Sequence, residues 1–307
     1  MKAIRVAQYG PVEGLSFEEL ASPVPGQGEV LIEVAGSGVN PVDWKVLSGA
    51  MKAFIPLQLP YTPGVEVAGR VVAVGENVSG LAVGDEVFGF INIVGGYATE
   101  VVASAERLAH RPNRLTALQA SGVPAVALTA WQALHEHARI KAGQRVLIHG
   151  AAGGVGSMAV QMARMAGATV IATASAYNHD YLQALGAAQV IDYNQAPFES
   201  VVDRVDVVLD LVGGDTQVRS WSVLKPGGVL VSPVSPPDAS LAEAAGACGK
   251  HFATRSDGAQ LQHIASLFES GELVIEVQVL PLSQAEDALR QSKERHIRGK
   301  LVLDASR

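Results

Sequence analysis

The segment with the clearest chemical meaning is a glycine-rich turn, His149-Gly150-Ala151-Ala152-Gly153-Gly154-Val155-Gly156. It follows an apolar run at residues 144–149 and precedes a stretch with helical spacing, the context that a dinucleotide-binding fingerprint requires. Gly153 would let the backbone approach a pyrophosphate, and Gly156 would let the helix pack closely on the strand. The amides at the helix start, together with its dipole, would hold the anion. The predicted dinucleotide contacts are Ala151, Ala152, Gly153, Gly154, Val155 and Gly156.

The turn departs from the usual fingerprint at one position, because Ala151 stands where the first glycine is expected. A tight strand-to-helix turn without any ligand is the alternative interpretation. The strands and helices that alternate on both sides of the turn favour dinucleotide binding over that alternative.

The form of the dinucleotide depends on the end of the next strand, where residues 172–178 contain no acidic residue. NAD-specific sites place an Asp or Glu there, about 20 residues after the turn, to bind the ribose 2′-hydroxyl. Small hydroxyls such as those of Thr173 and Ser175 tolerate a 2′-phosphate, so we expect NADPH in preference to NADH. Ser175 could instead be an ordinary helix cap. No Lys or Arg lies between Arg164 and Arg204 to neutralise the phosphate, so the candidate contacts are His179, Tyr193, Asn178 and, from the C-terminal tail, Lys300.

Short apolar strands alternate with helices around the turn. This alternation predicts a parallel sheet that is covered on both faces. The expected strands are residues 144–149, 169–173, 189–193, 205–210 and 228–231, with helices at about 120–137 and 155–165 and through 181–185.

The first 120 residues show a different pattern of many short strands, bounded by Gly and Pro, with few helical stretches. This pattern suggests a small, barrel-like β-rich domain. The apolar strand at residues 300–303 has no obvious place in the parallel sheet, so we assign the chain's end to the first domain. The predicted domains are residues 1–121 with 271–307, and residues 122–270.

The composition limits the range of functions. A length of 307 residues fits two domains, and the net charge of −7 without a basic run argues against nucleic-acid or anionic-membrane surfaces. The single cysteine, Cys248, excludes an intramolecular disulfide and a cysteine-based metal site, and we expect it to be a buried small residue rather than a nucleophile. With no signal-like or membrane-spanning segment, the expected location is the cytoplasm.

Several short motifs occur in a fixed order along the chain. With the phosphate turn, the ordered set resembles the zinc-less quinone oxidoreductase and enone reductase branch of the medium-chain dehydrogenase/reductase superfamily, over essentially the whole chain. The resemblance implies an α/β fold in which a Rossmann domain with a doubly wound parallel sheet is inserted into a GroES-like, β-rich catalytic domain. The motifs are Gly38-Val39-Asn40-Pro41-Val42-Asp43-Trp44-Lys45, Pro63-Gly64-Val65-Glu66-Val67-Ala68-Gly69, Gly84-Asp85-Glu86-Val87-Phe88-Gly89 and Arg298-Gly299-Lys300-Leu301-Val302-Leu303.

The same resemblance argues against zinc. Zinc-dependent members carry a Cys near the start of the first motif and a His in a Gly-His-Glu motif, and these positions correspond here to Asn40 or Pro41 and to Val65. The four structural cysteines are also absent. We therefore expect no metal site and no Lewis-acid activation of an alcohol.

The resemblance also implies the reaction, a hydride transfer from NADPH to a quinone or to the activated double bond of an α,β-unsaturated carbonyl. It places Asn40, Asp43 and Lys45 in the active cleft. Asn40 would donate to the substrate carbonyl or the nearby ribose, and Lys45 would stabilise the enolate or hold the ribose. Asp43 would orient Lys45. Alternatively, Asp43 and Lys45 form a surface ion pair, and Asn40 caps a turn before Pro41.

Further cofactor contacts follow from the resemblance and from the sheet. Thr129 matches a family segment near the nicotinamide, although a helical Thr bonded to its own main chain is the alternative. Val212 and Gly213 follow the fourth parallel strand, and Val234 and Ser235 follow the fifth, where such sheets open their ligand crevice. Relatives often form homodimers, which we also expect here. The competing functions are a non-catalytic NADPH-binding sensor or structural protein and a zinc-free reductase of saturated carbonyls.

Overall fold

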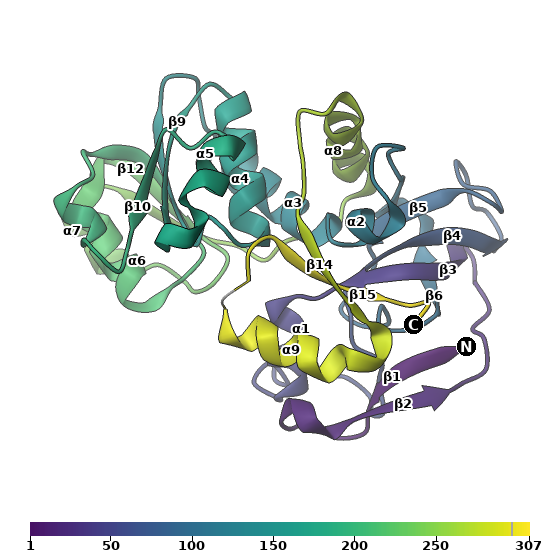
Figure 1. Cartoon of the computed structure of the whole chain (residues 1–307). Helices are drawn as coiled ribbons and strands as arrows, with labels where there is room; N and C mark the ends of the chain where they lie inside the picture. The colour runs from purple at the N-terminus through teal and green to yellow at the C-terminus, as the bar shows by residue number, and fades with distance from the viewer. Residues whose placement is uncertain (296) are drawn as a thin grey trace. The chain divides into compact units, whose positions relative to one another are not determined.

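The computed structural model describes residues 1–295 and 297–307 and contains two compact units (Figure 1). Unit 1 comprises Met1–Ala125 and Ser256–Arg307, and unit 2 comprises Val126–Arg255. The chain thus returns to unit 1 at Ser256, whereas we predicted this return at residue 271. The intervening helix α8 (Gly258–Ser270) packs on strand β7 (Leu108–His110) of unit 1, and Gln262 Oε1 accepts a hydrogen bond from the His110 amide at 3.0 Å.

Unit 2 contains a parallel sheet with the strand order β10-β9-β8-β11-β12-β13. All five strand pairings are parallel, as the alternation of strands and helices predicted. Successive side chains of a strand point to opposite faces, and Val146, Leu147 and Ile148 are all fully buried, so both faces of β8 are covered. The strands are β8 (Arg145–His149), β9 (Thr169–Ala174), β10 (Gln189–Asp192), β11 (Val205–Asp210), β12 (Leu224–Ser232) and β13 (Cys248–His251).

The helices of unit 2 connect these strands. The long helix expected near residues 120–137 is instead divided into α2 (Ala117–Ser121), which lies in unit 1, α3 (Pro124–Trp131), and the π-helical segment η3 (Gln132–Ala138). Pro124 at the start of α3 cannot continue a preceding helix, which explains the division. The remaining helices are α4 (Gly154–Met165), α5 (His179–Leu185), α6 (Gly214–Ser220) and α7 (Ala239–Ala244).

Unit 1 is built on a sheet with the order β14-β15-β3-β4-β5-β7, in which β6 also pairs with β3. Strand β15 (Lys300–Asp304) pairs with β3 (Glu29–Gly38), which places the chain's last strand in the first domain, as predicted. Two apolar cores fill the unit, one containing Tyr97, Leu47 and Leu289 and the other Ile32, Val67 and Val87. The other strands are β1 (Lys2–Val6), β2 (Leu15–Glu19), β4 (Glu66–Val74), β5 (Glu86–Phe90), β6 (Glu100–Ser104) and β14 (Val277–Pro281), and the other helices are α1 (Pro41–Leu47) and α9 (Ala285–Glu294).

Cys248 differs from the expectation of a buried residue. It begins β13, which pairs only with β12 at one edge of the unit 2 sheet among the described strands, and its side chain is exposed. An edge strand leaves one side without a neighbour, which the local sequence does not reveal.

Candidate functional site

The phosphate turn of unit 2 lies between β8 and α4, as predicted. Gly153 is the N-cap residue of α4 in extended conformation, no side chain caps this helix, and its first turn carries no acidic residue. The first amides of a helix have no partner within the helix, so this end can accept an anion. A Cβ atom at Gly156 would lie 2.4 Å from the Gly150 carbonyl oxygen and 2.5 Å from Ala151 Cα, so only glycine allows this packing of helix on turn.

The carboxyl ends of the parallel strands gather the other predicted cofactor residues at the edge of the sheet that carries the phosphate turn. The strand order reverses between β8 and β11, the point at which open α/β sheets bind their ligands. The residues at this edge are Thr173 in β9, Ser175 after β9, Tyr193 after β10, Val212 and Gly213 after β11, and Val234 and Ser235 after β12.

A buried carboxylate, Asp210, holds the loops after β11 and β12. Its Oδ1 accepts from the amides of Val212 at 3.0 Å and Gly213 at 2.8 Å. Its Oδ2 accepts from Gln217 Nε2 at 2.9 Å and Ser232 Oγ at 3.0 Å. Both oxygens of Asp210 are therefore occupied, and the two loops share one anchor. The sequence analysis named the loops but missed Asp210, although an acid that ends an apolar strand before Gly213-Gly214 was a usable signal.

His149, at the end of β8, forms a second buried network. Its Nδ1 lies 3.0 Å from Thr173 Oγ1, and its Nε2 lies 3.0 Å from Ser220 Oγ. Because Ser220 Oγ donates its proton to the Thr216 carbonyl at 2.6 Å, we assign the ring proton to Nε2 and an accepting role to Nδ1. Burial lowers the pKa of His149 to about 4, although the Asp210 charge raises it in part. The ring is therefore neutral at pH 7 and fixes the hydroxyl of Thr173.

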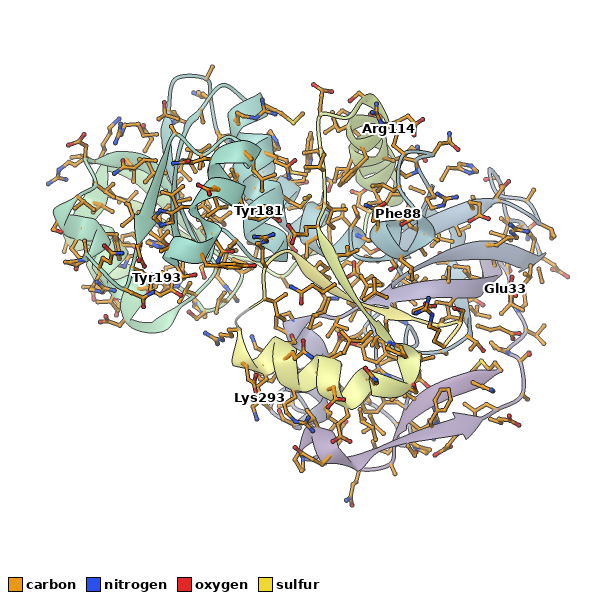
Figure 2. All side chains as sticks on the ribbon, viewed as in Figure 1. Glu33, Phe88, Arg114, Tyr181, Tyr193 and Lys293 are labelled. Atoms are coloured by element: carbon orange, nitrogen blue, oxygen red, sulfur yellow. The ribbon has the colours of Figure 1, made fainter. Side chains whose placement is uncertain are left out.

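The predicted 2′-phosphate region follows β9. Ser175 Oγ accepts from Asn178 Nδ2 at 3.1 Å, and Ser175 is the N-cap residue of a short 3-10 helix without a side-chain hydrogen bond to its backbone. Asn178 Oδ1 and His179 Nε2 are buried without a hydrogen-bond partner among the described residues. Tyr193, which Figure 2 labels, is 54% exposed. No Lys or Arg occurs in the sequence between Arg164 and Arg204. The residues that follow β9 would therefore offer a 2′-phosphate only uncharged polar groups and the ring of His179.

Thr129 lies in α3 and is nearly buried. Its hydroxyl is 2.7 Å from the hydroxyl of Thr254, so it bonds to another side chain of unit 2.

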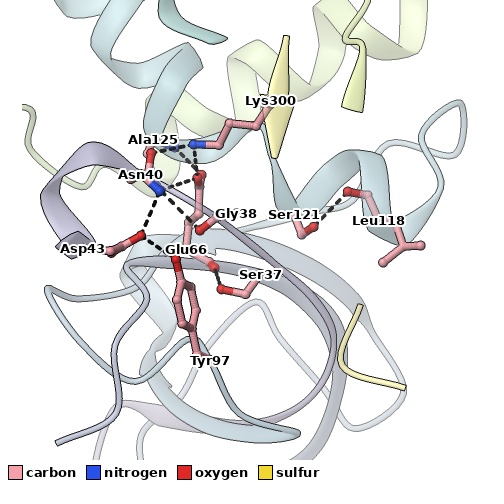
Figure 3. A network of polar contacts seen from close by, with 10 residues as sticks. All are labelled: Ser37, Gly38, Asn40, Asp43, Glu66, Tyr97, Leu118, Ser121, Ala125 and Lys300. Carbon is pink, nitrogen blue, oxygen red and sulfur yellow. Dashed lines mark hydrogen bonds and ion pairs between the residues drawn. The ribbon is translucent and has the colours of Figure 1, made fainter. Parts of the chain in front are cut away.

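In unit 1, the predicted catalytic segment consists of Asn40, which follows β3, and of Asp43 and Lys45 in α1; Figure 3 shows Asn40 and Asp43. Asn40 is the N-cap residue of α1, and Pro41 is the first helical residue, a position where its missing amide costs nothing. Asp43 Oδ2 accepts a hydrogen bond from the backbone N–H of Asn40 at 2.8 Å, and this bond is one half of a capping box. The predicted alternative for Asn40, a cap before Pro41, therefore describes its backbone position correctly.

The Asn40 side chain belongs to a buried cluster with Glu66 and Lys300. Its Nδ2 donates to Glu66 Oε1 at 2.7 Å and to the Gly38 carbonyl at 3.4 Å, and its Oδ1 accepts from Lys300 Nζ at 2.5 Å. Both amide hydrogens of Asn40 thus have partners within unit 1. This geometry argues against Asn40 as a direct donor to a substrate carbonyl and favours a positioning role.

Glu66 is the centre of this cluster and was missed as a functional residue by the sequence analysis. It is fully buried, its Oε1 pairs with Lys300 Nζ at 2.8 Å, and its Oε2 accepts from the Ala125 amide at 2.7 Å. A Cβ atom at Gly38 would lie 2.2 Å from Glu66 Oε1, so the glycine before Val39 makes room for the carboxylate. The available signal was a lone acid inside the apolar run Val65-Glu66-Val67-Ala68.

Lys300 occupies a different environment from the one predicted. We expected this residue to supply the cation for the 2′-phosphate, but its ammonium is almost fully buried in unit 1 and bonded to Glu66 and Asn40. A buried lysine needs a matching charge, and Glu66 provides it. We therefore place Lys300 in the Asn40 cluster.

Asp43 also differs from its predicted role of orienting Lys45. It is buried, and its Oδ2 accepts from the Tyr97 hydroxyl at 2.7 Å in addition to the Asn40 amide. No ion pair joins Asp43 and Lys45 in the part of the chain that the structure describes. The spacing of the two residues explains this, because side chains two positions apart on a helix point in different directions. Burial raises the pKa of Asp43 to about 7, and the hydrogen bonds from Asn40 and Tyr97 oppose this rise.

Lys45 is half-buried on α1, with its Nζ 5.7 Å from the centre of the Trp44 ring. Burial, assisted by the charge of Arg295, lowers its pKa. Within the described chain its ammonium has no hydrogen-bond or ion-pair partner. Lys45 is therefore the cation of the predicted catalytic segment that can bind a group of the substrate or of the cofactor.

Comparison with known proteins identifies the family. Residues 26–113 match the alcohol dehydrogenase GroES-like domain, and residues 185–303 match the zinc-binding dehydrogenase family. The chain is 33% identical to the chloroplastic quinone-oxidoreductase QR1 of Triphysaria versicolor over 326 residues, which cover 99% of each chain. The chain belongs to the quinone oxidoreductase family of the medium-chain dehydrogenase/reductase superfamily. The resemblance inferred from the ordered motifs and the two-part fold is thereby confirmed.

Two further matches illustrate the range of this quinone oxidoreductase family. The chain is 37% identical to the 2-methylene-furan-3-one reductase of Solanum lycopersicum over 288 residues, or 89% of this chain and 70% of that one. The crystal structure of Escherichia coli quinone oxidoreductase complexed with NADPH superposes with a TM-score of 0.91 and 27% identity, covering 99% of this chain and 100% of that chain. In the present chain, no helix among the described residues is long and apolar enough to span a membrane.

Proposed function

We propose that this protein is a zinc-independent NADPH-dependent oxidoreductase that transfers hydride to a quinone or to the activated double bond of an α,β-unsaturated carbonyl. The observation that carries the proposal is the uncapped start of α4 beside Gly153 and Gly156, at the reversal point of a parallel sheet in a quinone oxidoreductase chain. The quinone-oxidoreductase and enone-reductase names of its relatives support the choice of acceptor.

The residues of unit 2 fit a nicotinamide dinucleotide. The amides at the start of α4 would hold the pyrophosphate, and the loops anchored by Asp210 would line the nicotinamide side through Val212, Gly213, Val234 and Ser235. The absence of an acid from residues 172–178 leaves room for the 2′-phosphate near Ser175, His179 and Tyr193. The bound cofactor supplies the hydride, and the protein supplies position and charge.

The residues of unit 1 would act on the reduced substrate. Hydride addition to a conjugated acceptor leaves negative charge on its oxygen, and a fixed cation or donor stabilises that charge. We assign this task to Lys45, whose ammonium has no hydrogen-bond or ion-pair partner among the described residues, with contact to the nicotinamide ribose as its second predicted role. Glu66, Lys300 and Asn40 would act by fixing the start of α1, on which Lys45 lies.

The residues at the family's zinc positions do not fit a zinc ion. Val65 has no ligand atom, and the side-chain oxygen of Asn40 already accepts from Lys300. No group of three or more His, Cys, Asp or Glu side chains able to hold a metal lies among the described residues. These observations support a reaction without Lewis-acid activation of a carbonyl.

The test is the oxidation of NADPH and NADH, followed at about 340 nm, by purified and chelator-treated protein. The acceptors are a small enone, a benzoquinone and the saturated ketone that corresponds to the enone. We expect NADPH oxidation with the enone or the quinone and none with the ketone. Turnover of the ketone would indicate a general carbonyl reductase, and NADPH binding without any turnover would indicate a binding protein. The predicted homodimer and cytoplasmic location are separate proposals, the first of which light scattering after size-exclusion chromatography tests.

A further inference from the structure

The buried cluster of unit 1 contains more acids than cations. Asp43 and Glu66 are both buried, and the ammonium of Lys300 lies 2.8 Å from Glu66 Oε1. Asp43 has no cation within ion-pair distance among the residues described. Burial of an unpaired carboxylate is unfavourable, because a low dielectric strengthens its repulsion from Glu66 and removes its hydration. This arrangement favours the protonated form of one of the two carboxyl groups, and the ion pair of Glu66 with Lys300 leaves Asp43 as that group.

The hydrogen bonds show which oxygen of Asp43 carries that proton. Oδ2 accepts from the Asn40 amide at 2.8 Å and from the Tyr97 hydroxyl at 2.7 Å, as expected of a carbonyl oxygen. Oδ1 is buried and has no partner in the described structure, so it is the oxygen free to carry the proton. Burial raises the pKa of Asp43 to about 7, Lys300 lowers it and Glu66 raises it, in agreement with the charge count.

The other ionisable groups packed around Asp43 are two tyrosines and one ion pair. Tyr97 and Tyr61 are both buried, and burial together with the charge of Asp43 raises the pKa of each hydroxyl. Glu66 and Lys300 form an ion pair with each other. Asp43 is thus the carboxyl group of this cluster that has no counter-ion among the described residues.

We propose that Asp43 is a positioning residue that works as a neutral carboxylic acid, joining Tyr97 to the first turn of α1 for the reaction, and that its ionisation loosens this turn and slows reduction. Asp43 connects Asn40, at the start of α1, with Tyr97, which is 54 positions away in the chain. Lys45 lies on the same short helix, so a displaced first turn would move the ammonium to which the proposed function assigns charge stabilisation. The proposal rests on the reductase function proposed above.

The variant Asp43→Asn tests the proposal, because an asparagine keeps the accepting carbonyl and replaces the O–H donor with an amide that does not ionise. Activity is measured between about pH 6 and about pH 9, and each profile is normalised to its own maximum. We expect the wild-type kcat/KM to fall above neutrality by up to about tenfold per pH unit. We expect the profile of Asp43→Asn to lack this fall. The matched control Glu33→Gln, at an exposed carboxylate of β3, should retain the wild-type profile.

A second measurement does not depend on activity. A group whose folded pKa is raised stabilises the fold below its unfolded pKa, and this contribution is lost as the pH rises through the folded value. The urea midpoint of the wild type should therefore fall relative to that of Asp43→Asn as the pH rises from about 4 to about 7, and the difference should stay constant above that range. If the variant does not fold, infrared spectra of the wild type should show the band of a protonated carboxylic acid that disappears as the pH rises through about 7.

The possible results separate this proposal from the proposed function. A parallel pH dependence of the two midpoints, or no protonated-acid band, would overturn the neutral acid. Ionisation without a fall in wild-type activity would overturn the positioning role and leave the reductase in place. NADPH binding without reduction of any acceptor would overturn the proposed function, and the positioning role with it.

Discussion

The buried polar networks around Asp210 and His149 in unit 2 and around Asp43 in unit 1 differ in whether their polar atoms have hydrogen-bond partners. Behind the phosphate turn of unit 2, both oxygens of Asp210 and both ring nitrogens of His149 have hydrogen-bond partners. In unit 1, the carboxylate of Glu66 is satisfied, but Asp43 Oδ1 and the hydroxyl of Tyr61 are buried without a partner among the described residues. One network is saturated, and the other is not.

The difference separates two tasks. A saturated network fixes its loops before a ligand arrives, because every alternative arrangement would leave a buried donor or acceptor unpaired. An unsaturated buried carboxyl is less stable as an ion, and its protonation state can therefore change near neutral pH. The first arrangement suits a cofactor site that must be preformed, and the second suits a segment that takes part in proton-linked chemistry.

The largest expected effect follows from removal of Glu66. Glu66→Leu leaves the Lys300 ammonium buried without its counter-ion, and we expect the free energy of unfolding to fall by about 3–5 kcal/mol. Urea unfolding measures the change. The control Glu33→Leu, at an exposed position, should stay within about 0.5 kcal/mol of the wild type. The double variant Glu66→Leu/Lys300→Met should recover part of the loss, and a double variant as unstable as the single one would contradict the ion pair's role.

The second effect concerns His149 and the acid limb of stability. Because burial lowers its folded pKa to about 4, the neutral ring stabilises unit 2 above the unfolded value near 6.5. This contribution is lost as the pH falls from about 6.5 towards 4, and the total is at most about 3 kcal/mol. NMR of the imidazole ring should show His149 neutral at about pH 5.5. A ring that protonates near its ordinary value would contradict the saturated network.

The third effect concerns the loops that Asp210 anchors. Asp210→Asn replaces one accepting oxygen with an amide group that cannot accept from Gln217 and Ser232, so we expect a loss of about 2 kcal/mol in stability. NADPH should also bind about tenfold more weakly, because the loops that begin at Val212 lose their anchor. Calorimetry measures both. Asp203→Asn, at an exposed carboxylate, is the control, and equal affinities of the two variants would show that the loops do not need Asp210.

The smallest expected effect on stability, and one specific to catalysis, is that of Lys45→Met. Among the described residues the half-buried ammonium has no hydrogen-bond or ion-pair partner to lose, only its contact with the Trp44 ring, so the unfolding free energy should change by less than about 1 kcal/mol. The value of kcat/KM should fall about tenfold to hundredfold, because the developing negative charge loses its cation. Lys52→Met is a matched control, since Lys52 Nζ also lies over an aromatic ring, that of Tyr9. Equal activities of the two variants would remove Lys45 from the reaction.

The fold was largely predictable from the sequence because its signals are local. The alternation around the phosphate turn specified the parallel sheet, and the strand at residues 300–303 was correctly returned to the first domain. Helix α8 was assigned to the wrong unit, because an amphipathic helix after a strand has the same pattern whichever sheet it covers. Only its contact with β7 decides the assignment.

The candidate site was less predictable, because its contacts are not local. Asn40 and Lys300 are 260 positions apart, and no spacing rule connects them. The motifs pointed to Asn40, Asp43 and Lys45, but the partners of Asn40 and Asp43 are Glu66, Lys300 and Tyr97, which the local sequence did not connect to them. Burial explains the difference, because the sequence predicted that Asp43 orients Lys45, whereas the buried Asp43 is proposed to act as a neutral acid.

The most direct test of the proposed reaction follows the hydride itself. Chelator-treated protein would be given NADPH carrying deuterium at nicotinamide C4, with a small enone as the acceptor, and the product would be examined by NMR. The account predicts deuterium at the β-carbon of the saturated ketone and a solvent hydrogen at the α-carbon. Deuterium at the carbonyl carbon of an alcohol product, or an unchanged enone together with no oxidation of NADPH by a benzoquinone, would contradict it.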